Sequence, residues 1–171
     1  MKKKFVSIFS ALLLMTMLTT TAFAAPAAAE KEHIHVKGVV KLVETMLVDP
    51  VTNVLSWTGN GSGNGSHLGR FTDSFRVQLD PTLPFGNLTY YHFVTANGDS
   101  LFSSGPAVGT DLGPNIGHVV ENHIITGGTG RFAGASGNIT IERLVTWTCE
   151  CIGGIGTSYG TFTGDVVVVD R

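Results

Sequence analysis

Hydrophobic and polar residues alternate along much of this chain, and the longest alternating run extends from His33 to Met46. A period of two is typical of a β-strand with one face buried and the other exposed to water. The run therefore predicts a long strand whose other face, with His33, His35 and Lys37, is exposed to solvent. Its inward face carries Ile34, Val36, Gly38, Val40, Leu42 and Met46.

Seven further segments show strand patterns, and turn-forming residues lie between them. Asn97-Gly98 is the strongest hairpin signal, whereas residues 105–115 contain two prolines and are expected to form a loop. The Gly/Asn/Ser run at 59–66 fits either a loop or a glycine-rich end of the preceding strand. No helix is expected after residue 24. The further strands are expected at 54–58, 68–79, 88–95, 100–103, 116–126, 138–148 and 158–169.

About eight sequential antiparallel strands predict an all-β fold, a single eight-stranded barrel over residues 33–171. Closure into a barrel removes the exposed strand edges that an open sheet would present. An interior of this size is either filled by side chains or wide enough for one small ligand. A two-sheet sandwich is the alternative that the pattern leaves open.

The first 24 residues have the three-part pattern of a secretory signal peptide. A basic start at residues 2–4 precedes an apolar run at 5–18, and Ala22-Phe23-Ala24 supplies small residues for cleavage after Ala24. The alternative, a membrane anchor, is disfavoured because the run is shorter than the roughly 20 residues that span a bilayer. We therefore expect a secreted or periplasmic protein of bacterial type, with residues 25–32 as a disordered lead-in to the barrel.

The charge balance argues against a nucleic acid or an anionic membrane as the partner. The chain has 11 Lys and Arg against 13 Asp and Glu; without the three lysines of the predicted signal peptide the count is 8 against 13, a net charge of −5. The remaining basic side chains are scattered and form no patch. The segment 127–130 lacks the ending of a phosphate-binding loop, and no nucleophile motif is present.

Both cysteines of the chain lie in Cys149-Glu150-Cys151. In an exported protein they are expected to pair, provided that a turn brings them together, since residues two apart in a strand lie too far apart for an easy bridge. Gly153-Gly154 favours such a turn. Free thiols are the second alternative. A metal site is least favoured because two thiolates supply only half of a tetrahedral zinc shell, so we assign no metal.

Three charged residues, Glu44, Asp73 and Arg143, fall in the hydrophobic phase of their strands. Unless a bulge shifts the register, each side chain points into the interior, where an unpaired charge is very costly. Our hypothesis is that the three form a polar cluster inside an apolar lumen, as in a small-molecule site. The alternatives are charges at a barrel rim, with their heads in water, and a purely structural ion network.

Aromatic side chains complete the candidates for the lumen. Trp57 and Trp147 each lie in an apolar phase. Residues 88–95 have two mixed faces, so either the face with Tyr90 and His92 or the opposite face lies inside. No catalytic residue is assigned. The predicted ligand-binding residues are Glu44, Trp57, Asp73, Tyr90, His92, Arg143 and Trp147.

The glycine-rich segment TGGTGRFAGASG at 126–137 is expected to be a tight connection, with Phe132 closing one end of the barrel and Arg131 at its rim. Together with GSHLGRFT at 65–72 and TANGD at 95–99, it resembles bacterial secreted proteins with an allene oxide cyclase-like or dirigent-like barrel of the calycin type. The resemblance covers most of the chain from the third expected strand onward.

Barrels of this group bind apolar substrates in the lumen and steer reactive intermediates without a cofactor. The resemblance therefore implies a secreted protein that binds a small apolar molecule and needs no cofactor. Two alternatives stay open: a cofactor-free cyclase or isomerase, and a structural protein with a filled barrel and no ligand. Several relatives are dimers or trimers, so the resemblance also implies a homodimer or homotrimer.

Overall fold

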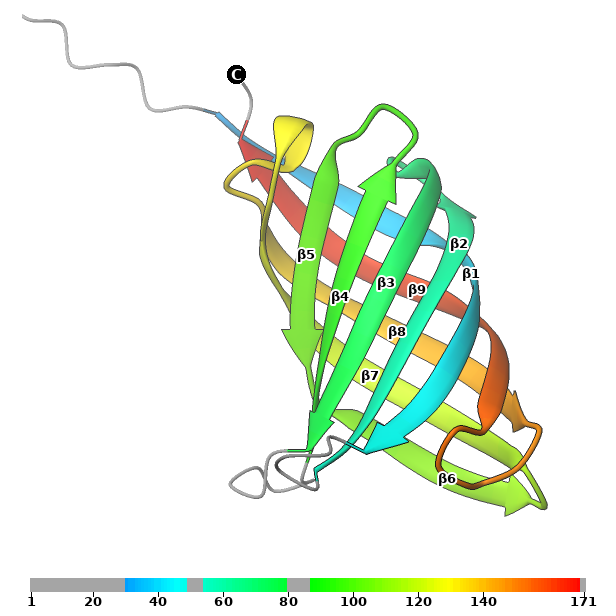
Figure 1. Cartoon of the computed structure of the whole chain (residues 1–171). Coiled ribbons are helices and arrows are strands. Elements are labelled where there is room, and N and C mark those ends of the chain that lie inside the picture. The colour runs from blue at the N-terminus through cyan, green and yellow to red at the C-terminus, as the bar shows by residue number, and fades with distance from the viewer. Residues whose placement is uncertain (1–29, 49–53, 80–86, 170–171) are drawn as a thin grey trace, which may run out of the picture.

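Strands account for most of the residues that the structure describes, which are 30–48, 54–79 and 87–169 of a computed structural model (Figure 1). The predicted signal peptide lies outside these residues, as does the predicted lead-in up to residue 29. Lys31 and Glu32, expected in the lead-in, already belong to the first strand. The strands are β1 (Lys31–Val48), β2 (Leu55–Gly65), β3 (Gly69–Leu79), β4 (Asn87–Thr95), β5 (Ser100–Gly105), β6 (Ala107–Gly113), β7 (Ile116–Gly128), β8 (Ser136–Trp147) and β9 (Ile155–Val169).

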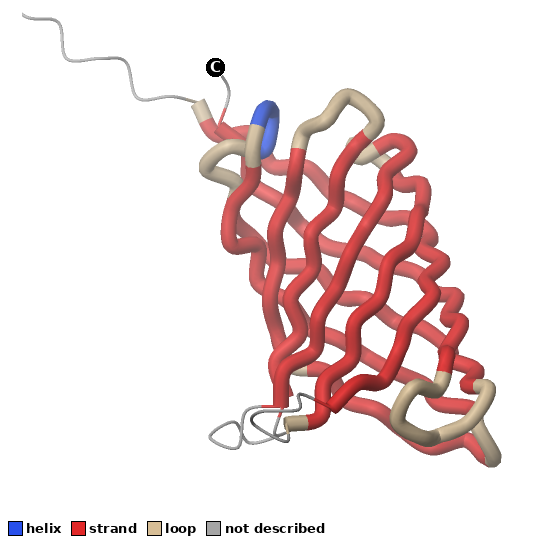
Figure 2. Tube along the Cα trace, in the orientation of Figure 1, coloured by secondary structure: helices blue, strands red, loops and turns tan. Residues whose placement is uncertain are grey.

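Eight of these strands close into an antiparallel barrel. Their order is β5-β4-β3-β2-β1-β9-β8-β7, and an additional pairing of β5 with β7 completes the ring. Figure 2 shows the strands wrapped obliquely around one axis, with a single described helical turn, η1 (Gly130–Phe132), at one end. The predicted eight-stranded barrel is confirmed, and the alternative of a two-sheet sandwich is wrong. No helix among the described residues is long and apolar enough to cross a membrane.

The prediction of a loop at 105–115 is wrong, because this segment contains β6, a strand in addition to the eight that form the barrel. β6 pairs with β7 and lies outside the closed ring. All of its residues between the first and the last are exposed. A strand without a buried face has no reason to alternate between apolar and polar residues, so its sequence resembles a loop.

The glycine-rich run at 59–66 is largely strand, since β2 extends to Gly65. Its glycines face inward and alternate with exposed asparagine and serine residues. The ring of Phe75 lies over Gly59 and the ring of Phe71 over Gly63, so closely that a Cβ atom on either glycine would overlap the ring. Along these glycines the inner face of β2 is therefore bare backbone in contact with phenylalanine rings.

The end of the barrel that carries η1 is filled with side chains. The ring of Phe71 contacts those of Phe93 and Phe162 edge-on, with centroid distances of 5.5 and 5.7 Å. Phe132 of η1 is buried and closes this end, at the position that the glycine-rich segment predicts. Arg131 beside it is exposed, with its Nε atom 3.4 Å from Oδ2 of Asp99. We call this half the filled end.

Candidate ligand-binding cavity

A cavity of about 370 Å³ lies at the opposite end of the barrel, where β1 ends and β2 begins. Figure 1 shows this end of the strands at the bottom. Inward-facing positions of β1, β2, β3, β7 and β8 form its walls, and the extra strand β6 adds to its border. The chain contains two tryptophans, and both line the cavity. The apolar wall consists of Met46, Trp57, Val77, Ala107, Ile116, Val119, Val145 and Trp147.

A cluster of one arginine and two carboxylates forms the inner end of the cavity. Nη2 of Arg143 donates to Oε1 of Glu121 at 3.2 Å, and Nη1 donates to Glu44 and, at 3.3 Å, to Oγ of Ser158. The side chains of Arg143 and Glu44 are 3% exposed and that of Glu121 is fully buried. The guanidinium therefore joins β1, β7 and β8 across the lumen through charge-assisted hydrogen bonds.

Aromatic groups continue this cluster across the barrel. The hydroxyl of Tyr91 donates to Oε2 of Glu121 at 2.9 Å. The Cζ atom of Arg143 lies 4.9 Å from the ring centroid of Phe75, within the range of a cation–π interaction. The ring of His123 packs edge-on against Tyr91, with the centroids 5.3 Å apart. We define the polar belt as Glu44, Asp73, Tyr91, Glu121, His123 and Arg143.

Burial changes the pKa of several groups in the polar belt. It raises the pKa of Glu44 above its usual value, although Arg143 opposes this shift. Asp73 has no hydrogen-bond partner for either carboxyl oxygen among the described residues, and burial raises its pKa to about 7. Burial lowers the pKa of His123 to about 4, so its ring is neutral at pH 7. Burial also acts to lower the pKa of Arg143, but the surrounding acidic groups outweigh it and keep the guanidinium charged.

Four of the seven residues predicted from the sequence to bind a ligand line the cavity, namely Glu44, Trp57, Arg143 and Trp147. Asp73 also points into the lumen and is buried, but it lies one layer deeper, where its partner on β2 is Gly61. The structure thus brings Glu44 and Arg143 into contact. Asp73 has no hydrogen-bond partner among the described residues.

The placement of Tyr90 and His92 in the lumen is wrong. Tyr90 is 45% exposed, and the ring of His92 packs against Phe102 on the outer surface of the barrel. The opposite face of β4, with Tyr91 and Phe93, is the one that points inward. Aromatic stacking accounts for this choice, because the ring of Tyr91 lies stacked on both neighbouring phenylalanine rings.

Glu121 is the functional candidate that sequence reasoning missed. It lies on β7, where the phase of Val119 and Glu121 is no more apolar than the phase of Val120 and Asn122. The alternation there does not indicate which face is inside. The one available signal was the need of a buried arginine for more than one acidic partner, since a guanidinium has five donors.

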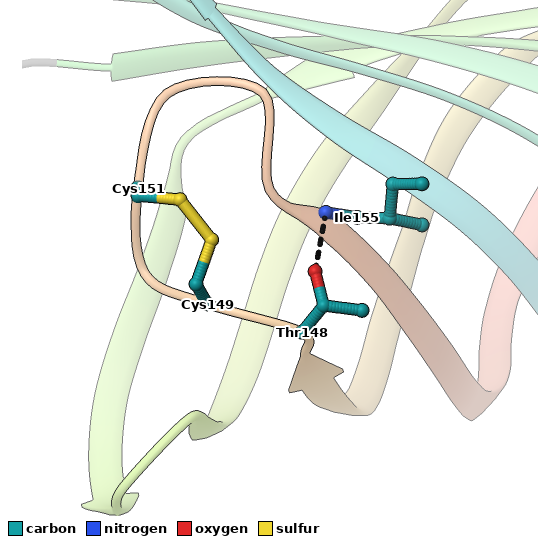
Figure 3. The surroundings of a disulfide bond; sticks show 4 residues. All are labelled: Thr148, Cys149, Cys151 and Ile155. Atoms are coloured by element: carbon teal, nitrogen blue, oxygen red, sulfur yellow. Dashed lines mark hydrogen bonds between the residues drawn. A yellow bond between two sulfur atoms is a disulfide. The ribbon is translucent and has the colours of Figure 1, made fainter.

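The outer end of the cavity carries Glu150, which lies between Cys149 and Cys151 in the loop from β8 to β9. The two cysteines form a disulfide (Figure 3). At the base of the loop, the backbone N–H of Ile155 donates to Oγ1 of Thr148 at 3.1 Å (Figure 3). The disulfide closes a small ring around Glu150 and so restricts the backbone that carries this carboxylate.

The arrangement offers an apolar binding surface that ends at fixed polar groups. Among the residues described, no group of three or more His, Cys, Asp and Glu side chains has the arrangement of a metal site. The guanidinium N–H groups of Arg143 already donate hydrogen bonds to Glu44 and Glu121. Glu44 is a carboxyl group on the cavity wall whose pKa is raised by burial.

Comparisons with known proteins identify the fold but no family. No family model matches the chain, and no curated protein matches it. Among solved structures, the pterocarpan synthase dirigent protein GePTS1 is similar, with a TM-score of 0.54 and 13% sequence identity over 83% of this chain and 88% of that chain. The chain therefore has a dirigent-like barrel fold.

Proposed function

We propose that this protein binds a small, largely apolar molecule in the cavity at the open end of its barrel. The observation that carries the proposal is the cavity itself, which combines two tryptophans and several aliphatic side chains with a buried Arg–carboxylate cluster at its inner end. Ligand sites of small proteins are typically of about 300–1,000 Å³, mostly apolar, with a few fixed polar groups. The likeness of the fold to a dirigent protein supports the same function.

A pair of adjacent valines provides the test. Val119 lines the cavity, whereas Val120 follows it on β7 and points to the outer face. We expect Val119→Phe to occupy the cavity and abolish binding of a neutral terpene alcohol such as geraniol, and Val120→Phe to leave binding unchanged. Because both tryptophans line the cavity, their fluorescence reports binding directly. Equal binding by the two variants, with intact folding, would contradict the proposal.

A second candidate function is that of a cofactor-free cyclase or isomerase. It is favoured by Glu44, a buried carboxyl group on the cavity wall with a raised pKa, which is the property of a general acid. The neighbour GePTS1 is a pterocarpan synthase, so the fold supports synthesis in that protein. Turnover of unsaturated epoxides or polyenes that is lost in Glu44→Gln would establish catalysis; binding without turnover leaves the protein a binder.

The site of action that we propose is outside the cytoplasm. The pattern of residues 1–24 supports export. The disulfide agrees with this, because disulfides form and persist in oxidising compartments. Amino-terminal sequencing of the protein recovered outside the cytoplasm of its host should begin at Ala25. An intact Met1 in that fraction would contradict cleavage.

A further inference from the structure

We infer that the molecule bound in the cavity carries a positive charge, as a protonated amine or a quaternary ammonium group on an apolar body. This inference rests on the proposed binding function and names the class of ligand. It follows from the balance of charge around the cavity, from the state of its single guanidinium, and from the aromatic part of its wall.

The described residues that line the cavity are strongly acidic. Four carboxyl groups, those of Glu44, Asp111, Glu121 and Glu150, face one basic group, that of Arg143. Neither lysine nor histidine is present in this lining.

The single guanidinium is not free to receive an anion. Arg143 already donates to Glu44, Glu121 and Ser158 inside the barrel. Its charge is already matched by two buried carboxyl groups, so a carboxylate or phosphate ligand would add a further negative charge beside them, which is unfavourable. The arginine therefore neutralises the protein's own carboxylates rather than recruiting acidic ligands.

The two outer carboxylates differ from the inner pair because no basic side chain among the described residues forms an ion pair with them. Glu150 makes no hydrogen bond or ion pair with another described residue, and Asp111 accepts a hydrogen bond from the backbone N–H of Gly113. Both are exposed at the outer end of the cavity. Their field favours entry of a cation and disfavours entry of an anion.

The apolar wall is of a kind that holds organic cations. Trp57 and Trp147 present indole rings, the side chains that attract cations most strongly through their π faces. Met46 adds a polarisable thioether to the same wall. An alkylammonium ion can thus place its apolar body against these side chains and its charge near the outer carboxylates or the indoles.

The test compares three probes with one carbon skeleton: geranylamine, geraniol and geranate, which are cationic, neutral and anionic at pH 7. Tryptophan fluorescence and calorimetry measure each affinity. We expect geranylamine to bind about tenfold more tightly than geraniol, and geranate to bind most weakly. Equal affinities, or tightest binding of geranate, would overturn the inference and leave the binding function intact. Failure of all three probes to bind would overturn the binding function and the inference together.

A double variant identifies the groups responsible. Glu150→Gln with Asp111→Asn should reduce the advantage of geranylamine several-fold while the affinity for geraniol stays unchanged. The matched control is Glu32→Gln, which removes an exposed carboxylate from β1 at the filled end. It should change neither affinity. An undiminished preference for geranylamine in the double variant would contradict the role of these two carboxylates.

Discussion

The two ends of this barrel are built from the same eight strands, yet aromatic rings pack the lumen at one end, whereas at the other end a cavity extends inward to the buried Arg143 cluster. At the filled end, the glycines of β2 let phenylalanine rings from neighbouring strands lie against bare backbone. At the cavity end, the inward side chains are valines, a methionine and two tryptophans that border a space of about 370 Å³. Glycines can thus make a barrel interior denser, because they let large rings from other strands occupy the space.

The polar belt marks the boundary between the two halves. Its three carboxyl groups, those of Glu44, Asp73 and Glu121, face a single guanidinium, that of Arg143. Full ionisation would leave two uncompensated negative charges in the interior, which is strongly unfavourable. Asp73, which lacks a partner and has a pKa of about 7, is the group that we expect to retain a proton in neutral solution.

The largest expected effect is on the boundary. Arg143→Met leaves Glu44 and Glu121 buried without their cation, so it should lower the free energy of unfolding by about 4 kcal/mol at pH 7. Denaturant unfolding measures this loss, and Arg76→Met, an exposed arginine on β3, is the control. Adding Glu44→Gln and Glu121→Gln to the variant should restore much of the stability. Failure of the triple variant to recover would show that shape, not charge, holds the belt together.

The next effect compares the ends directly. Phe93 is 1% exposed and packs against three other aromatic rings, so Phe93→Ala should cost about 3–5 kcal/mol. Trp147 borders existing empty space, so Trp147→Ala should cost less than Phe93→Ala despite the larger side chain that it removes. Both values come from denaturant unfolding. Similar losses in the two variants would mean that the cavity end is packed as tightly as the filled end.

A smaller effect depends on pH. The pKa of Asp73 is about 7 in the folded protein, against 3.8 for an ordinary aspartate, so the folded state binds the proton more tightly. The contribution of Asp73 is therefore most favourable below about pH 4 and is lost as the pH rises to about 7. Asp73→Asn should remove this dependence, match the wild type near pH 4 and exceed its stability at pH 8 by on the order of 3 kcal/mol.

Unfolding curves at several pH values test the role of Asp73. Glu32→Gln is the control: the Glu32 side chain is exposed and makes no ion pair with another described residue, so this variant should have nearly the stability of the wild type. His123 has the opposite effect, because its pKa is about 4 in the folded protein and 6.5 in an ordinary histidine. The folded state binds this proton less tightly, so the protein loses stability as the pH falls below about 6.5. An Asp73→Asn variant whose stability stays parallel to the wild type from pH 4 to pH 8 would show that Asp73 is not the titrating group.

The smallest expected effect concerns the cavity's outer end. Replacing Cys149 and Cys151 with serine opens a very short loop, and loop entropy predicts a loss of about 1.5 kcal/mol. Because the disulfide restricts the backbone of Glu150, the affinity for geranylamine should also fall, whereas that for geraniol should not. Calorimetry on the double variant checks both values, and a fall in both affinities would indicate a general loosening of the cavity.

Much of the fold could be predicted because, in long strands with one buried face, the alternation of apolar and polar residues shows which face points inward. The same phase placed Glu44 and Arg143 in the interior, since each interrupts a regular apolar face. Glu121 could not be assigned because β7 is mixed on both faces. The inward side of β4 depends on the cross-strand pair of Tyr91 with Phe75 of β3, and the mixed sequence of β4 alone does not reveal this pair. β6 could not be predicted because a strand without a buried face need not alternate between apolar and polar residues.

The pairing of β1 with β9 has a consequence for how the chain matures. Its ladder runs from Lys31 opposite Val169 to Thr45 opposite Ile155, and it joins the first strand to the last. The ring is incomplete until β9 has been synthesised, so closure is a late event that depends on contacts far apart in sequence. A nascent or carboxy-terminally shortened chain exposes the unpaired edge of β1, and it is in this form that the molecule is most vulnerable to aggregation and proteolysis.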